Sequence, residues 1–447
     1  MKSVALHNLG CKVNAYEMDF MQQMLQEKGY KIVSFDEAAD IYIVNTCTVT
    51  NIADRKSRQM LHRAKRKNPN AVVVAVGCYV QTGQEALLED GAVDLAVGNN
   101  RKKDLVEILE AYLARRGDSA EIPGEEAEQS EPVIDTIDIA HAPYEEMTLR
   151  KTAEHTRAYI KIQDGCNQFC SYCIIPYARG RVRSRMEEDI LQEARGMAEA
   201  GYREVVLTGI HISSYGIDRG GSELVRLLEQ LSEIEGVERI RLGSLEPGIV
   251  TEEFASRIGA LPKVCPHFHL SLQSGSDTVL RRMNRRYDTT GYLSAVETLR
   301  KYYVDPAITT DVIVGFPGET EEEFAQTEDF LRRVGFYEMH IFKYSRRQGT
   351  RAAAMEGQLT EAEKAVRSDR LISLEREMSR AYRETFLGKT EAVLFEELIE
   401  KDSVAYWVGH TTRYLKVARK AERGENLQNR IVPGRLATFL EEDVLLS

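Results

Sequence analysis

The sequence of 447 residues contains no apolar run that approaches the roughly 20 residues needed to cross a bilayer as a helix. Its first residues, Met1 to Leu6, also lack the pattern of a secretory signal peptide. Cysteine is scarce, and the odd number of seven argues against a framework of disulfides. Together these absences predict a protein of the reducing cytoplasm with no membrane-spanning segment.

The chain also lacks a surplus of basic residues, because its formal net charge is −11, and composition alone therefore argues against a nucleic-acid partner. The charge is uneven, however. Residues 55–67 contain seven Lys or Arg and no acid. Such a run is usually the solvated face of a helix, but in an acidic protein an RNA-facing surface is an equally good interpretation.

Three cysteines, Cys166, Cys170 and Cys173, follow a strand-like run at the spacing C-x3-C-x2-C. Full ligation of a cubane iron–sulfur cluster takes four thiolates, so three leave one iron open for a substrate or cofactor. A zinc knuckle is the alternative, but no fourth ligand lies nearby in the sequence. The spacing therefore favours an iron–sulfur site.

With an aromatic residue directly before its last cysteine, this loop resembles that of the radical S-adenosylmethionine (SAM) enzymes. The resemblance implies that the amino and carboxylate groups of SAM chelate the open iron of a cluster held by Cys166, Cys170 and Cys173. It further implies that an electron from the cluster cleaves SAM to a 5′-deoxyadenosyl radical.

The first hundred residues alternate short β-branched strands and helices, which predicts an open parallel α/β sheet. The expected strands are residues 4–9, 41–44, 71–76 and 93–97, and the expected helices are 15–27, 53–67 and 83–89. Three of these strands are followed by Cys11, Cys47 and Cys78. Carboxyl ends of parallel strands share one edge, so we expect these thiols to converge. Separately buried cysteines are the alternative, but the repeated position favours a second three-thiolate cluster.

Residues 115–149 change in composition, because acids gather there around Pro123, Gly124 and Pro132. This pattern predicts an acidic linker between two domains.

Residues 150–385 alternate strands and helices again, which predicts an open (β/α)6 partial barrel with its active site at the carboxyl ends of the strands. Polar residues and glycines at those ends are candidates for binding the cofactor, because they permit close approach and hydrogen bonding to a ribose or amino group. They are Thr208, Gly209, Ser271, Gln273, Ser274, Gly315 and Glu319.

Four arginines follow the cysteine loop: Arg179, Arg181, Arg183 and Arg185. Arginine forks suit carboxylate and phosphate, so SAM binding, RNA binding and ordinary salt bridges all remain open for them. Several lone residues in or beside apolar strands are interpreted as structural only. They are Cys265, His211, His267, His269 and Trp407.

Residues 386–447 contain short strands, which predicts a small all-β module. Residues 410–435 within it carry seven Lys or Arg against two Glu, with Tyr414 among them. Small β-barrels with basic loops and aromatic residues commonly bind RNA.

In this order of parts the chain resembles the methylthiotransferase family over essentially its whole length. The matching motifs are Gly10-Cys11-Lys12-Val13-Asn14, Asn45-Thr46-Cys47, Gly77-Cys78, and residues 165–173, 271–276 and 315–320. The resemblance implies a methylthiotransferase domain at residues 1–114, a radical SAM domain at 150–385 and a TRAM-like RNA-binding domain at 386–447.

The resemblance also implies two [4Fe-4S] clusters, one per cysteine triad, and two uses of SAM. One SAM donates a methyl group to sulfur at the Cys11, Cys47 and Cys78 cluster. Another provides the radical that abstracts hydrogen from an unactivated carbon, where the methylthio group is then attached. No catalytic residue beyond the cysteines is implied; the electron donor would be a flavodoxin or ferredoxin, and the sulfur source is not indicated.

Three branches of the family differ in substrate: isopentenylated adenosine-37 of tRNA, threonylcarbamoylated adenosine-37 of tRNA, or an aspartate of a ribosomal protein. The opening from Gly10 to Asn14 with Tyr16 and Glu17, and the segment 207–216, look like the threonylcarbamoyladenosine branch, which acts on ANN-decoding tRNAs. The basic segments also fit RNA better than protein. The other two substrates, and a non-catalytic RNA-binding protein with iron–sulfur clusters, are the alternatives.

Overall fold

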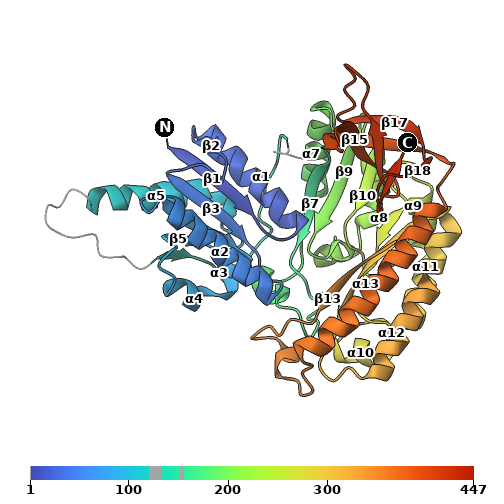
Figure 1. The fold of residues 1–447 in the computed structure, drawn as a ribbon. Coiled ribbons are helices and arrows are strands. Elements are labelled where there is room, and N and C mark those ends of the chain that lie inside the picture. The colour runs from blue at the N-terminus through green and yellow to red at the C-terminus, as the bar shows by residue number, and fades with distance from the viewer. Residues whose placement is uncertain (1, 120–131, 152–155) are drawn as a thin grey trace.

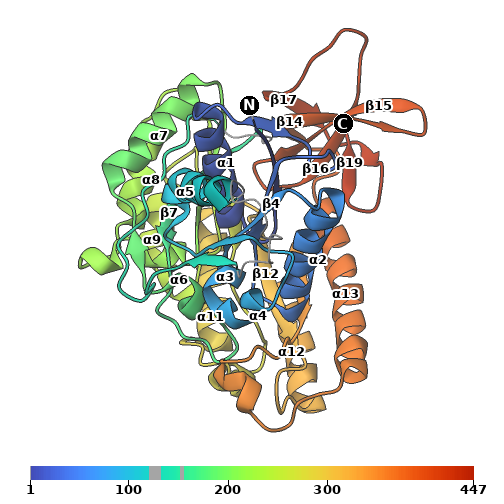
Figure 2. The ribbon, with the colours of Figure 1, turned by 90° about the vertical axis from the view of Figure 1, so that its left-hand side faces the viewer.

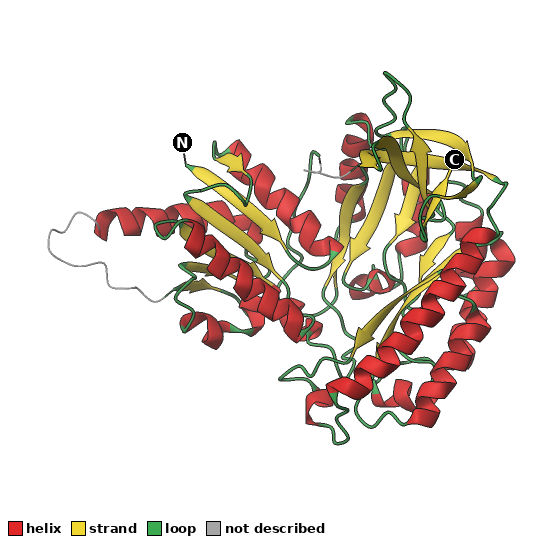
Figure 3. Cartoon of the chain, viewed as in Figure 1, coloured by secondary structure: helices red, strands yellow, loops and turns green. Residues whose placement is uncertain are grey.

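The computed structural model describes residues 2–119, 132–151 and 156–447, which form three units (Figures 1 and 3). An N-terminal α/β sheet lies beside a larger α/β unit, and a small β unit lies at the upper end of the view (Figure 1). No helix of the described residues has the length and apolarity that a membrane span requires.

The N-terminal sheet is wholly parallel, with strand order β2-β1-β3-β4-β5-β6. Its strands are β1 (Ser3–Asn8), β2 (Lys31–Val33), β3 (Ile41–Thr46), β4 (Val72–Gly77), β5 (Leu95–Val97) and β6 (Val133–Asp135). The central strands β3 and β4 are buried throughout, as expected for Val/Ile-rich parallel strands covered on both faces.

Each face of this sheet packs on its own set of helices. Tyr42 and Val73 face a cluster with α2 (Asn51–Lys67), α3 (Cys78–Thr82) and α4 (Gln84–Leu88). Ile43 and Val74 point the other way, toward α1 (Lys12–Glu27) and α5 (Leu105–Ser119). The period-two alternation of the strands thus divides the apolar residues between two cores.

The predicted sheet is confirmed, and two edge strands, β2 and β6, extend it. Strand β6 and the end of α5 fall inside the stretch predicted as a linker, because three residues suffice to add an edge strand to β5. The predicted linker residues 120–131, including Glu121, Glu131, Pro123 and Gly124, lie outside the described residues.

The central unit contains the six predicted parallel strands: β7 (Ala158–Asp164), β9 (Glu204–Gly209), β10 (Arg239–Leu242), β11 (His267–His269), β12 (Ala307–Val314) and β13 (Glu338–Lys343). Parallel bridges, including Leu245 to Leu270, join β10 to the β11 segment, so the strands follow one another as an open (β/α)6 partial barrel. The hairpin-like β8 (Arg183–Ser184) pairs antiparallel with β7.

Helices cover the outer face of the barrel and bury one large apolar core against it. They are α7 (Glu187–Glu199), α8 (Leu224–Ser232), α9 (Glu252–Gly259), α11 (Thr289–Tyr302), α12 (Glu321–Val334) and α13 (Glu361–Glu384). Phe268, Leu270 and Val312 point outward into this core. The residues that alternate with them along β11 and β12 therefore point the other way, into the interior of the barrel.

The C-terminal unit is a six-stranded sheet of order β17-β14-β15-β16-β19-β18, antiparallel except where β16 meets β19. Its strands are β14 (Thr390–Lys401), β15 (Val404–Thr411), β16 (Lys416–Lys420), β17 (Arg430–Arg435), β18 (Thr438–Phe439) and β19 (Val444–Leu446). Figures 1 and 2 both place it at the end of α13. Tyr414 reaches from it to the barrel, where its ring lies 5.0 Å from the Arg157 guanidinium and stacks on His267 at 5.1 Å.

Candidate active site

The loop with Cys166, Cys170 and Cys173 follows β7, at the carboxyl end of the barrel. Gly165 has φ +71°, and a Cβ at this residue would lie 1.8 Å from the carbonyl oxygen of Arg181, so only glycine fits. Within the loop, Cys173 N donates to Cys170 O at 3.0 Å. The loop thereby holds the three thiols near enough to influence each other electrostatically.

Nitrogen donors surround this first triad. Arg285 Nη1 lies 3.1 Å from Cys170 Sγ, and the backbone N of Gln168 lies 3.4 Å from Cys166 Sγ. Burial raises the pKa of Cys166 to about 11 and that of Cys173 to about 12. Burial thus disfavours the ionised form of these thiols, and the N–H donors suit the sulfur atoms of an iron–sulfur cluster.

The second triad forms at the edge of the N-terminal sheet, as the positions of its cysteines predict. The strand register places Asn8 opposite Asn45. The carboxyl ends of β1 and β3, which precede Cys11 and Cys47, therefore lie side by side. Asn14 Nδ2 ties them together, because it donates to Leu9 O at 2.7 Å and to Thr46 O at 3.0 Å.

All three thiols of this second triad are electrostatic neighbours, since Cys11 and Cys78 both contribute to the raised pKa of Cys47. Burial is the largest cause and raises that pKa to about 12. The structure thus brings the predicted residues together, and their role as ligands stays a prediction.

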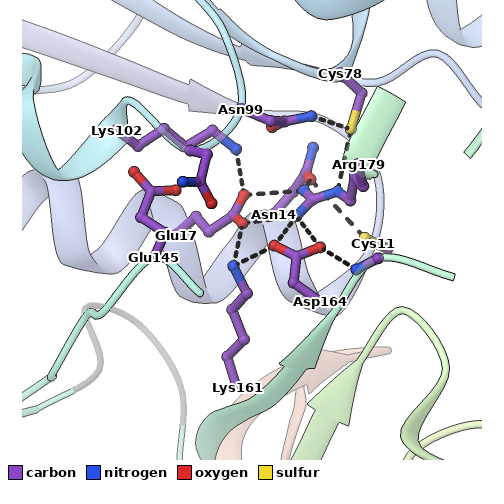
Figure 4. A network of polar contacts seen from close by, with 12 residues as sticks. Cys11, Asn14, Glu17, Cys78, Asn99, Lys102, Glu145, Lys161, Asp164 and Arg179 are labelled. Carbon is purple, nitrogen blue, oxygen red and sulfur yellow. Dashed lines mark hydrogen bonds and ion pairs between the residues drawn. The ribbon is translucent and has the colours of Figure 1, made fainter. Parts of the chain in front are cut away.

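A buried network of charges joins the second triad to the barrel (Figure 4). Arg179 Nη1 lies 2.7 Å from Glu17 Oε1 and 3.1 Å from Asp164 Oδ2. Lys161 contacts the same two carboxylates at 2.8 and 2.6 Å, and Lys102 forms a further ion pair with Glu17. Glu17 and Lys102 belong to the N-terminal unit, whereas Lys161, Asp164 and Arg179 belong to the barrel, so the network fixes one unit against the other.

This network carries more positive than negative charge, since four cations face the carboxylates of Glu17 and Asp164, the fourth being Arg183 at 3.8 Å from Asp164. The cations hold the pKa of both carboxyl groups below the usual range despite burial. Part of this positive charge lies beside the sulfur of Cys78, because Arg179 Nε is 3.3 Å from Cys78 Sγ. Asn99 Nδ2 is a second donor to the same sulfur, at 3.4 Å. A surplus cation and two N–H donors at a thiol fit an anionic iron–sulfur cluster held by the second triad.

The structure decides among the interpretations of the four arginines. Arg179, Arg183 and Arg185 are buried, and Arg185 pairs with the buried Glu193, so salt bridges inside the protein account for these three. Arg183 Nη2 donates to Arg179 O at 2.7 Å and thereby supports the network. Arg181 is exposed and lies over the ring of Phe169 at 4.5 Å.

The predicted cofactor-binding residues divide into two groups. Glu319 is buried, accepts from Gly315 N at 2.7 Å and pairs with Arg367 at 2.6 Å, while Ser274 contacts Thr327 at 3.3 Å. These contacts give Glu319 and Ser274 internal partners in this structure. The others line the carboxyl ends of β9 and of the segment after β11, where a cofactor would have to approach. They are Thr208, Gly209, Ser271 and Gln273.

Sequence reasoning missed a polar cluster beside the cysteine loop. His211, interpreted as structural, lies at the end of β9, where its Nε2 is 2.5 Å from Glu246 Oε2 and Nδ1 is 2.6 Å from Ser214 Oγ. Arg285 joins Glu246 at 3.1 Å and so connects this cluster to Cys170. The only signal in the sequence was the position of His211 directly after the Thr208-Gly209 strand end.

A second polar group lies on the interior face of the barrel. His269, also interpreted as structural, has ligand atoms within 4.8 Å of those of Asp311 and His340. The interpretations of Cys265 and Trp407 as buried structural residues agree with their positions. His267 is buried as well, but its Nδ1 has no hydrogen-bond partner among the described residues.

Two family models match the chain. The model described as "Radical SAM superfamily" covers residues 160–331, and the one described as "Uncharacterized protein family UPF0004" covers residues 3–98. Their ranges coincide with the two units that carry the cysteine triads.

Curated relatives resemble nearly the whole chain. The "Threonylcarbamoyladenosine tRNA methylthiotransferase MtaB" of Bacillus subtilis (strain 168) is 40% identical over 94% of this chain and 91% of its own length. The "tRNA-2-methylthio-N(6)-dimethylallyladenosine synthase" of Thermoanaerobacter pseudethanolicus (strain ATCC 33223 / 39E) is 36% identical over 89% of this chain and 83% of its own.

Among solved structures, the radical S-adenosylmethionine methyltransferase TsrM from Kitasatospora setae superposes with a TM-score of 0.56. The alignment covers 78% of this chain and 77% of that one at 18% identity. At that identity the likeness concerns the fold alone.

Proposed function

The chain belongs to the tRNA methylthiotransferases of the radical SAM superfamily, and from that premise we propose that it converts N6-threonylcarbamoyladenosine at position 37 of tRNA to its 2-methylthio derivative. The observation that carries the choice of substrate is the 40% identity, over almost the whole of both chains, to a relative with this activity in its name. The pair of cysteine triads, each among N–H donors, supports the reaction.

When bound, one [4Fe-4S] cluster would supply the electron that cleaves SAM, and the other would hold the sulfur that accepts a methyl group. In this proposal Cys166, Cys170 and Cys173 hold the first, and Cys11, Cys47 and Cys78 hold the second. The protein contributes the relative placement of the two, since the Glu17, Asp164 and Arg179 network joins the units that carry them. Cys47 and Cys78 of the second triad are buried, whereas Cys11 is exposed, so the triad is open to solvent or substrate on the side of Cys11.

Substrate RNA would contact two basic surfaces in this proposal. On α2, Arg55, Lys56 and Arg66 are exposed and form no ion pair with any described residue. On the C-terminal sheet, which we interpret as a TRAM-like RNA-binding domain, Lys416 and Arg430 come from the basic segment 410–435. Unpaired cations on both surfaces suit the phosphate backbone of an anticodon stem-loop. We place the reaction in the cytoplasm, with a flavodoxin or ferredoxin as electron donor.

The test is to incubate the reconstituted protein with SAM, a reductant and tRNA that carries threonylcarbamoyladenosine, and to analyse the nucleosides by mass spectrometry. We expect 2-methylthio-N6-threonylcarbamoyladenosine and 5′-deoxyadenosine. The isopentenyladenosine tRNA, run in parallel, should remain unmodified. Product only on that second tRNA would transfer the chain to the branch of the dimethylallyladenosine synthase relatives, and no product on either would contradict the proposal.

A further inference from the structure

Lys12 is the first residue of α1 and stands directly after Cys11 of the second triad. Helix α1 lies between the N-terminal sheet and the barrel, and its first turns contact the barrel, since Asn14 accepts from Arg179 at 2.6 Å and Glu17 pairs with Lys161 at 2.8 Å. The Lys12 side chain is exposed, and its ammonium group forms no hydrogen bond or ion pair with any described residue. Its electrostatic neighbours are Arg157, Arg241 and Glu204, all on barrel strands or next to them.

The charges around Lys12 leave positive charge unneutralised. Arg241 Nε pairs with Glu204 Oε1 at 2.7 Å, and Arg157 pairs with Glu396 at 3.3 Å, so both neighbouring arginines already have a carboxylate. Arg239 also shares Glu204, at 3.6 Å. Because two carboxylates serve three arginines, no acid of this group remains for Lys12. A free anion is the partner that such a group would bind.

His267 is a second group with an unpartnered polar atom among the described residues, and it is an electrostatic neighbour of Lys12. His267, on the inner face of β11, is 9% exposed, and its buried Nδ1 has no hydrogen-bond partner in the part of the chain that the structure describes. Lys12 is among the charges that hold the pKa of His267 well below its usual value, after burial and Arg241. The imidazole is therefore neutral near pH 7 and keeps one N–H donor, which can share an anion with Lys12.

The substrates of the two tRNA branches differ in the chemistry that this pair would recognise. The N6-threonylcarbamoyl group ends in a carboxylate and a hydroxyl, whereas the isopentenyl group is wholly apolar. An ammonium group without a partner is destabilised next to an apolar substituent, whereas a carboxylate next to it stabilises it. Lys12 also stands next to Cys11, so an anion bound there would hold the modified base near the second triad.

We propose that Lys12 and His267 form the subsite that binds the carboxylate of the N6-threonylcarbamoyl group. The assignment rests on the proposed function, since it names the part of the substrate that this site selects. Lys12 is a specificity residue in this assignment and takes no part in bond making. Its position explains how a chain with the same two triads can discriminate a charged from an uncharged substituent on the same adenine.

The experiment compares three anticodon stem-loop hairpins that are identical except at adenosine-37: one with threonylcarbamoyladenosine, one with its neutral methyl ester and one with unmodified adenosine. Binding to the reconstituted wild-type protein is measured by fluorescence anisotropy at one fixed salt concentration. We expect the acid to bind roughly tenfold more tightly than the ester, as one charge-assisted hydrogen bond gives. Lys12→Met should reduce this ratio to about one, Lys12→Arg should keep most of it, and His267→Gln should lower it in part.

Lys31→Met is the matched control, because Lys31 is exposed on edge strand β2 of the same unit and forms no ion pair. It removes one positive charge and should leave the ratio unchanged. Iron content and the thermal unfolding midpoint of each variant show whether both clusters and the fold persist. If Lys12→Met loses iron, Lys12→Gln and Lys12→Arg take its place in the comparison.

The outcomes separate this inference from the proposed function. If the wild-type protein methylthiolates the acid hairpin but Lys12→Met retains the full preference for acid over ester, the subsite assignment is wrong and the function stands. An equal affinity of wild type for acid and ester overturns the assignment too. If the wild-type protein forms no methylthio product on the acid hairpin, the proposed function itself fails, whatever the Lys12 variants do.

Discussion

Cys166, Cys170 and Cys173 stand on one short loop, whereas Cys11, Cys47 and Cys78 come from three strand ends that are far apart in the sequence. The loop depends on local geometry, above all on Gly165 with its positive φ. The second triad, at the strand ends, depends on the register of the N-terminal sheet and on the network of ion pairs that reaches into the barrel. A set of three thiols can thus be encoded by a local loop or by the tertiary fold, and we expect the two triads to respond differently to substitution.

Removing one thiol from each triad should produce the largest difference in activity between the two triads. Cys173→Ala should abolish SAM cleavage, because two thiolates cannot hold the cluster that donates the electron. Cys47→Ala should leave SAM cleavage intact and abolish methylthio transfer. Liquid chromatography of 5′-deoxyadenosine and mass spectrometry of the nucleosides measure both activities. Cys265→Ala, at the buried cysteine of neither triad, is the control and should change neither activity. Methylthio product from Cys47→Ala would refute the second cluster.

Arg179→Met tests whether the strand-end triad needs the barrel. Removing this buried guanidinium leaves Glu17 and Asp164 short of a partner and should cost about 3–5 kcal/mol of unfolding free energy. It also removes a donor to Cys78, so the chain should lose iron from the second site while it keeps the first. Denaturant titration and iron analysis measure the two effects.

Arg332→Met is the control for Arg179→Met, because Arg332 is exposed and pairs only with the exposed Glu377. A loss of iron from both sites, or from neither, would contradict the separate dependence of the two triads.

The two glycines before the triads should differ in the cost of an added methyl group. Gly165→Ala places a Cβ 1.8 Å from a backbone oxygen and also adds left-handed strain, so the cysteine loop must move. Gly10→Ala, at φ +104°, meets Cys47 Cβ at 3.0 Å and should cost mainly the strain of roughly 1–2 kcal/mol. Denaturant titration compares them, and Gly196→Ala in helix α7, with open space around it, should be neutral or stabilising. Equal costs for Gly10 and Gly165 would contradict the local encoding of the loop.

The smallest effect concerns the basic surface of α2, which we propose to bind RNA and which follows Cys47 of the second triad in the chain. Replacing Arg55, Lys56 and Arg66 on α2 by Ala should weaken tRNA binding roughly tenfold at low salt and reduce the slope of log K against log salt by about 2–3. SAM cleavage without RNA should not change, because α2 belongs to the unit that carries only the second triad. Filter binding over a salt series measures the slope. Three substitutions at Arg195, Arg226 and Arg257 on the outer helices of the barrel serve as the charge control, and an equal loss there would show that the α2 surface is not specific.

Much of the fold could be predicted, because β3 and β4 of the N-terminal sheet are largely apolar runs and because strands alternate with helices along both α/β units. The edge strands β2 and β6 were missed, since three residues give too little periodicity to stand out. The contacts of His211 were missed for another reason. A single histidine after a strand carries no signal of the Glu246 and Arg285 side chains that meet it from other loops.

Local sequence encodes the spacing of Cys166, Cys170 and Cys173 and places the other three cysteines after parallel strands. Convergence of those three followed from topology, because carboxyl ends of parallel strands share an edge. Only the tertiary structure decided what surrounds them. Arg179, Glu17, Lys161 and Asp164 come from two units, and no periodicity relates them. A buried charge needs an oppositely charged side chain close to it in three dimensions, and that partner can lie far away in the sequence. Such partners meet only once the two units have packed together.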